Sequence, residues 1–202
     1  MARAIDGAPL PSLPIIPEIR MRRFAPFLFA LLVLPVGVEA QDQAAIDKAL
    51  AAAPARMRDA TTVVRWNADH SYEVLREGTN RMVCYDRSSE TRRAAFDVQC
   101  TSLGNLERVA QNRRFRAMSA DRQEENALIE AAEANGTRVQ PEYGSVWIAM
   151  RGDDQANAGT HTTIAVPGAT TESTGLPESN SEGGAYIMGA GTSTAHIMIP
   201  GS

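Results

Sequence analysis

The chain contains only two cysteines, Cys84 and Cys100. In an exported protein an even number of cysteines predicts a disulfide, because the compartment is oxidising and no other partner exists within the chain. A bridge that closes a loop of this size stabilises a fold by roughly 3 kcal/mol, chiefly by restricting the unfolded chain. The alternative is a redox-active dithiol, but those sites typically have Cys-x-x-Cys spacing. We therefore expect a structural Cys84–Cys100 disulfide.

A β-hairpin is predicted around the first cysteine. Residues 72–77 and 81–86 are short runs rich in valine, tyrosine and leucine, and Gly78-Thr79-Asn80 between them is typical of a three-residue turn. Such a hairpin would place Glu77 opposite Arg81 beside the turn. Cys84 would then lie on a strand, and Cys100 would reach it after a polar loop.

The N-terminal segment has the pattern of a signal peptide. A basic start at Met21, an apolar run over residues 24–38 and small residues ending at Ala40 occur in the required order. Residues 21–40 are therefore predicted to be a signal peptide, and residues 1–20 an extension upstream of the true initiator. The apolar run is shorter than the roughly 20 residues of a membrane-spanning helix. We expect residues 41–202 to form one domain, periplasmic or secreted, with no integral membrane span.

The remaining patterns predict an α+β fold. Helices are expected over residues 41–53, where Pro54 ends the first, over residues 102–118, and from a capping box at Asp121 and Glu124 to Ala134. Strands are expected over residues 61–66, 145–151, 162–166, 185–188 and 195–199, with a long Gly, Ser and Thr-rich loop over residues 167–184. The sum is a small, mainly antiparallel sheet packed against two or three helices, with one disulfide.

Charge is distributed unevenly along the chain. Removal of residues 1–40 takes away four arginines and three acidic residues and leaves a net charge of −5, which argues against a nucleic-acid-binding protein. Arg113, Arg114 and Arg116 form the densest basic cluster, and a regular helix brings the first two onto its apolar face. Either the helix ends near Gln111, or these side chains extend past the apolar edge or pair with acids of the C-terminal half. The cluster is thus a structural, solvated helix face, which we favour, or a patch for an anionic component of the cell envelope.

Four polar residues are the candidates for a catalytic or metal site. His161 and His196 belong to predicted C-terminal strands, and Asp153 and Asp154 precede the first of them. No two of these residues have a recognised metal-ligand spacing, and no serine lies in a Gly-x-Ser-x-Gly motif. Gly189-Ala190-Gly191 is not a phosphate-binding loop, because no lysine follows these residues and no helix is expected to begin there. We therefore expect no cofactor and no metal.

Scattered segments resemble a set of uncharacterised exported bacterial proteins that carry two cysteines. They are the runs 75–80, 84–86, 150–152, 156–157 and 195–199, together with Cys100. This resemblance implies export and the disulfide, and it brings no activity. From the sequence we expect a non-enzymatic periplasmic or secreted domain that binds an envelope component or a small ligand. The alternative is a hydrolase or metal-dependent enzyme that uses His161 and His196.

Overall fold

The computed structural model of the chain describes residues 36–200. The predicted extension at residues 1–20 and residues 21–35 of the predicted signal peptide lie outside this range. Residues 36–40 form the start of helix α1 (Val36–Ala49), in which Ile46 is the first buried residue among the side chains described. No helix in the described range is both long and apolar enough to cross a membrane.

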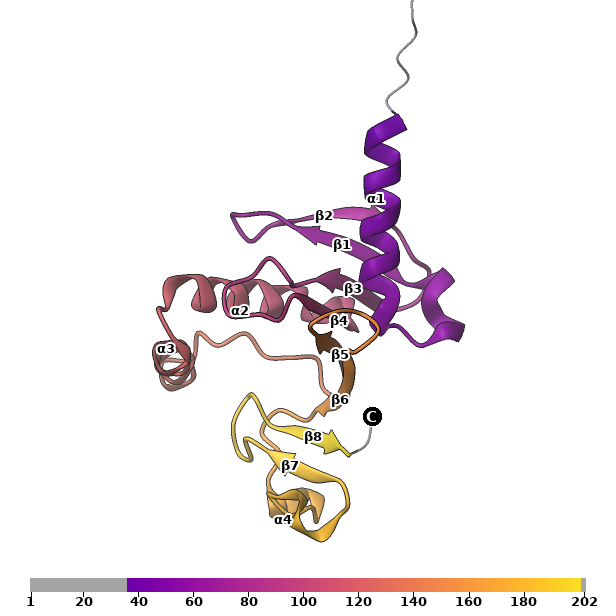
Figure 1. Cartoon of the computed structure of the whole chain (residues 1–202). Coiled ribbons are helices and arrows are strands. Elements are labelled where there is room, and N and C mark those ends of the chain that lie inside the picture. Colours follow the sequence, from indigo (N-terminus) through magenta and orange to yellow (C-terminus); the bar gives the residue numbers. More distant parts are fainter. Residues whose placement is uncertain (1–35, 201–202) are drawn as a thin grey trace, which may run out of the picture. The chain divides into compact units, whose positions relative to one another are not determined.

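One eight-stranded sheet connects most of the described chain (Figure 1), with the strand order β2-β1-β3-β4-β5-β6-β8-β7. Within the described residues the only parallel pair is β1 with β3. The predicted α+β class is thus confirmed, but the sheet is mixed and larger than expected. The strands are β1 (Thr62–Trp66), β2 (Tyr72–Arg76), β3 (Met82–Asp86), β4 (Phe96–Ser102), β5 (Val146–Gly152), β6 (Gly159–Ala165), β7 (Tyr186–Met188) and β8 (His196–Ile199).

The predicted hairpin between residues 72–77 and 81–86 is wrong. Strand β2 pairs with β1 through the turn at residues 67–71, and β1 separates β2 from β3. Gly78 instead lies in a connection that passes over the start of β1, where the backbone N–H groups of Thr79 and Asn80 both donate to the Ala60 carbonyl. A Cβ atom at Gly78 would clash with the backbone of Ala60 and Thr62. This glycine is required for close approach of two backbone segments and not for a turn.

The predicted disulfide is confirmed. Cys84 on β3 and Cys100 on β4 lie directly opposite each other in the antiparallel ladder, with an S–S distance of 2.02 Å. Both side chains are fully buried on the sheet face that α1 covers, and a short 3₁₀ helix (Leu50–Ala52) extends this cover to the break before Pro54. A second 3₁₀ helix (Ala55–Ala60) then leads into β1.

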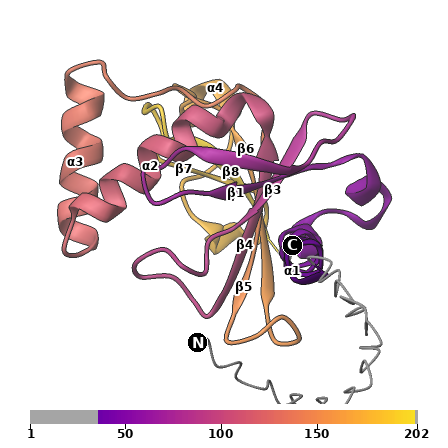
Figure 2. The ribbon, with the colours of Figure 1, turned by 90° about the horizontal axis from the view of Figure 1, so that it is seen from above.

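The opposite sheet face is covered by α2 (Leu106–Met118), as Figure 2 shows, with α1 on one side of the sheet and α2 on the other. A 3₁₀ helix (Leu103–Asn105) joins β4 to α2. Because side chains alternate along a strand, Phe96, Val98 and Cys100 of β4 face α1, and the intervening polar residues face α2. The core under α2 contains Tyr85, whose hydroxyl donates to Gln99.

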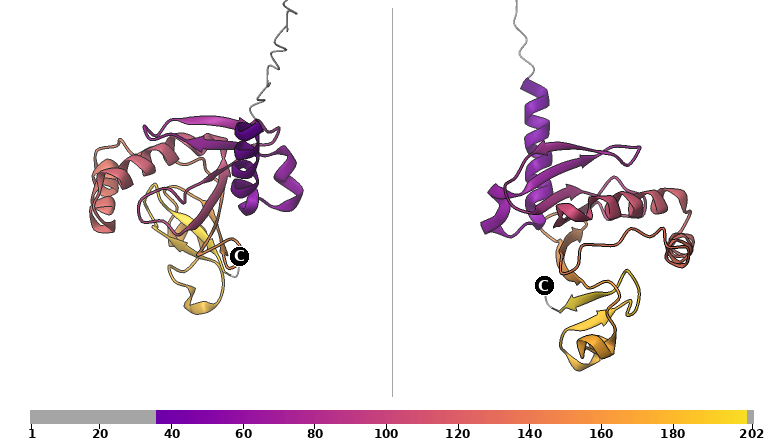
Figure 3. Two further views of the ribbon diagram at one scale, coloured as in Figure 1. Left: turned by 45° about the horizontal axis from the view of Figure 1, so that its top comes forward. Right: turned by 180° about the vertical axis from the view of Figure 1, so that it is seen from behind.

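The Asp121 cap predicted for the third helix is confirmed, but the capping box is not complete, because the Glu124 carboxylate accepts from the backbone N–H of Ala120 and not from that of Asp121. Helix α3 (Arg122–Ala134) begins after Asp121, whose carboxylate accepts from the Glu124 backbone N–H at 2.9 Å, and ends at Asn135 before Gly136. The predicted loop at residues 167–184 contains a short helix, α4 (Thr171–Thr174), and a 3₁₀ helix (Asn180–Glu182). Both views in Figure 3 place α4 beside the β7–β8 end of the sheet.

Candidate anion-binding pocket

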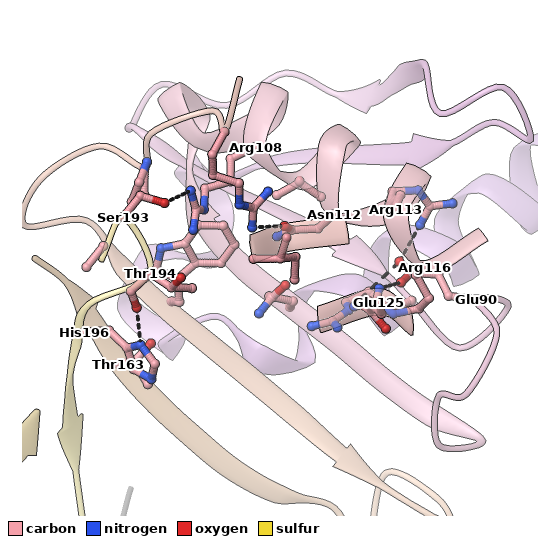
Figure 4. A pocket seen from close by; sticks show the side chains of 18 of the residues that line it. Glu90, Arg108, Asn112, Arg113, Arg116, Glu125, Thr163, Ser193, Thr194 and His196 are labelled. Carbon is pink, nitrogen blue, oxygen red and sulfur yellow. Dashed lines mark hydrogen bonds and ion pairs between the residues drawn. The ribbon is translucent and has the colours of Figure 1, made fainter. Parts of the chain in front are cut away.

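A pocket of about 280 Å³ lies between α2 and the face of the sheet that α2 covers. Helix α3 and the connection from α3 to β5 supply further walls, and residues 193–196 close one end. Figure 4 shows Arg108, Ser193 and His196 at that end, and Glu90, Arg113 and Arg116 at the other. Six arginines and two glutamates line the pocket within the described part of the chain: Arg87, Arg93, Arg108, Arg113, Arg116 and Arg138, with Glu90 and Glu125.

Helix α2 supplies one whole wall of the pocket. Arg108, Asn112 and Arg116 line it at intervals of four residues, which places them on one helix face. The helix continues without a break to Met118, so the expectation that it could end near Gln111 is not met. Arg113 also lies inward, whereas Arg114 is exposed. The basic cluster is therefore divided between the pocket and solvent.

At one end of the pocket, four arginines surround Glu90. Its carboxylate pairs with Arg113 and, at 2.5 Å, with Arg116, both on α2. The Nε atoms of Arg93 and Arg87 lie 3.4 and 3.9 Å from its oxygens. Only 5% of the Glu90 side chain is exposed, so these pairs lie largely out of water. Arg113 and Arg116 are thus structural partners of a buried acid, and they do not form a solvated helix face.

Asp97 and Glu125 complete this end. Asp97 on β4 lies 3.7 Å from the Nε of Arg87 and 3.8 Å from that of Arg93. Burial raises the pKa of Asp97, and the nearby arginines oppose this rise only in part. Glu125 on α3 accepts from Arg116 at 2.9 Å and also pairs with Arg92, which lies outside the pocket. In the described chain, no hydrogen bond uses the terminal Nη groups of Arg87 or Arg93, although both residues line the pocket.

At the other end lie two arginines that are almost fully buried. Arg108 and Arg138 are 3% and 5% exposed. Arg138 donates to the side-chain oxygens of Gln111 and Asn112, both at 2.6 Å, and its Nε lies 4.0 Å from Glu133. Arg138 therefore has neutral hydrogen-bond acceptors and one distant carboxylate.

Arg108 has no carboxylate within ion-pair distance among the described residues. Its Nη1 group donates both of its hydrogen bonds, one to Ser193 Oγ at 3.1 Å and one to the Val139 carbonyl oxygen. Burial and the neighbouring Arg138 lower the pKa of Arg108 to about 10, and Glu133 opposes this only in part. The guanidinium therefore stays charged at neutral pH, with Nη2 and Nε making no hydrogen bond in the described chain.

The chain around the start of β8 orients two polar groups, Ser193 and His196, at the same end of the pocket as Arg108. The Ser193 hydroxyl donates to Glu133, so its oxygen lone pairs are left to accept from Arg108. His196 Nδ1 lies 2.7 Å from the Thr194 carbonyl oxygen, which can only accept, so Nδ1 carries a proton. In the neutral ring the Nε2 of His196 is then an acceptor.

The four residues predicted as a catalytic or metal site do not meet. His196 on β8 lines the pocket, whereas His161 on β6 does not. The β6 residue directly opposite His196 is Ala165, so His161 lies four residues further along β6. Asp153 and Asp154 lie in the turn after β5, where Asp154 accepts from Asn157. In the described residues no group of three His, Cys, Asp or Glu side chains could hold a metal ion.

Arg108, Arg138 and Ser193 are not among the site residues predicted from the sequence. One signal for Arg108 was available, because Arg108, Asn112 and Arg116 recur every fourth residue in a predicted helix. Nothing in the sequence brings Arg138 or Ser193 to that helix. No protein-family model, curated protein or solved structure matches the chain.

Proposed function

We propose that this protein is an exported binding protein that holds a small organic anion in the pocket beside α2. The observation that carries the proposal is the buried pair of Arg108 and Arg138. Two guanidinium groups share one carboxylate, Glu133, which lies 4.0 Å from one of them. A buried charge without a partner is costly, by several kcal/mol as an order of magnitude. An anion bound against Arg108 would remove that cost.

The shape of the pocket favours a small molecule. A volume of about 280 Å³ lies at the lower end of the range of small-molecule sites. Apolar walls from Val109, Ile129, Pro141 and Trp147 accompany the arginines. Such a mixture of apolar surface and a few converging donors is typical of a binding site for an organic acid.

Titration calorimetry on the full chain tests this function. The probes are hexanoate, benzoate and phenyl phosphate, each paired with its uncharged analogue. We expect at least one anion to bind and its uncharged analogue not to bind. Arg108→Gln should lose that binding, and Arg114→Gln, an exposed arginine of the same helix, should retain it. If all three anions fail to bind, or if binding is insensitive to Arg108→Gln, the proposal is wrong.

Export is part of the same proposal, and the Cys84–Cys100 disulfide supports it. Cleavage after Ala40 would cut α1 between the exposed residues Ala40 and Gln41, before Ile46, the first buried residue among the side chains described. Mass spectrometry of the protein from its native host should show an N-terminus at or near Gln41. A native protein that retains residues 1–20 would contradict this part.

A further inference from the structure

Each end of the pocket has more positive charge than its carboxylates neutralise. Around Arg108 and Arg138, Glu133 is the one carboxylate that pairs with either arginine in the described chain. Around Glu90, four arginines of the pocket form ion pairs with three carboxylates. The arginines are Arg87, Arg93, Arg113 and Arg116, and the carboxylates are those of Glu90, Asp97 and Glu125. Each end therefore has one positive charge more than its carboxylates neutralise. Arg92, which shares Glu125, increases the excess at the second end.

Each end also has free hydrogen-bond donors. At the first end they are the Nη2 and Nε of Arg108, and at the second they are the Nη groups of Arg87 and Arg93, none of which has a hydrogen bond within the described residues. Terminal guanidinium N–H groups are the donors that bind carboxylate oxygens in bidentate fashion. Charge excess and free donors thus coincide at two separate places.

The two ends are separated along one helix face. Arg108 and Arg116 are eight residues apart on α2, which corresponds to about 12 Å along the helix axis. Asn112 and Val109 line the pocket between them, and Trp147 lines it from the sheet. A single carboxylate group cannot contact both ends, whereas an elongated ligand with an acidic group at each of its own ends can.

We propose that the ligand is an elongated organic dianion, such as an α,ω-dicarboxylate, with one acidic group at Arg108 and the other at Arg87 and Arg93. This inference rests on the proposed function and specifies the ligand of the same pocket. The apolar middle of the ligand contacts Val109 and Trp147. A volume of about 280 Å³ equals that of roughly nine water molecules, which is room enough for a ligand of the size of adipate.

Calorimetry on the full chain with succinate, adipate, suberate and hexanoate tests the inference. Adipate should bind about tenfold or more tighter than hexanoate, which has the same number of carbons and only one charge. Succinate, which is too short to reach both ends, should bind little more tightly than hexanoate. Arg93→Gln should reduce adipate affinity to that of hexanoate and leave hexanoate unchanged. Arg108→Gln should weaken both ligands, and Arg114→Gln neither.

The outcomes separate this inference from the function on which it rests. If adipate and hexanoate bind the wild type equally, and both depend on Arg108, the function stands and the dianion is refuted. A tighter adipate complex that is insensitive to Arg93→Gln and Arg87→Gln refutes the second acidic subsite. If no organic anion binds, the function itself fails. The length series uses the unmodified protein, so a variant that misfolds does not prevent the test, and Arg93→Lys, which keeps the charge, is the milder variant.

Discussion

Replacing Cys84 and Cys100 together by alanine is expected to lower the free energy of unfolding by about 5 kcal/mol. The cysteines are 16 residues apart, and opening a loop of that size costs about 3 kcal/mol through the entropy of the unfolded chain. Both sulfur atoms are fully buried against Val63, Phe96 and Ile148, and losing each one removes packing comparable with a buried methylene, about 1 kcal/mol each. For a chain of this size the melting temperature should fall by about 10–20 °C.

Urea unfolding followed by tryptophan fluorescence measures this change, because Trp66 is partly buried and packs against the core on the other sheet face. Reduced wild-type protein is the matched control, since it opens the loop and keeps both sulfurs. It should lose about 3 kcal/mol, and the double alanine variant should lose more. A reduced protein within about 1 kcal/mol of the oxidised one would refute the loop-closure argument. Ligand affinity should be unchanged below the melting temperature, because the disulfide lies on the face opposite the pocket.

Three further changes test the fold and the site. Glu90→Gln should destabilise the protein by about 3–5 kcal/mol in urea unfolding, because it leaves four arginines around an uncharged side chain; a loss below about 1 kcal/mol would show that those pairs are weak. Gly78→Ala should cost at least about 1–3 kcal/mol through its clash with Ala60, whereas alanine at Gly159, which has open space, should be tolerated. Burial lowers the folded-state pKa of both His70 and His161, so the unfolded chain binds more protons; stability should fall as pH decreases through about 6.5, and a melting temperature that rises on acidification from about pH 7 to 5 would contradict this.

Local sequence signals predicted the elements that local interactions determine. Helix α3 has its start and stop where Asp121 and Asn135 place them, because a cap is a contact between neighbouring residues. The strands over residues 146–152 and 196–199 were also anticipated to within a few residues of their ends. The disulfide could be predicted because the chain offers one possible pairing.

The elements that sequence interpretation missed depend on distant contacts. Strand β4 was not predicted, because Asp97, Gln99 and Thr101 interrupt its apolar residues; these side chains face α2 and the pocket. The hairpin at Gly78 was misassigned because a glycine in a close backbone crossing and a glycine in a turn look alike in sequence. The pocket residue Arg138 could not be predicted, since arginine is normally a surface residue and only the fold brings it to Asn112.

A third hydrophobic cluster lies in the C-terminal part of the sheet, and we expect this part to open separately from the rest of the sheet. Val166, Ala169, Ile187 and Ala195 form a core that is separate from the two cores flanking the disulfide-bonded strands. Segments with a separate small core open by local fluctuations, so the amides of β7 and β8 should exchange with deuterium sooner than those of β3 and β4. The pocket spans the boundary, because Ser193 joins this part to α2 through Arg108. An occupied pocket should therefore slow exchange in β8, so that ligand binding would be detected as protection of the last strand of the fold.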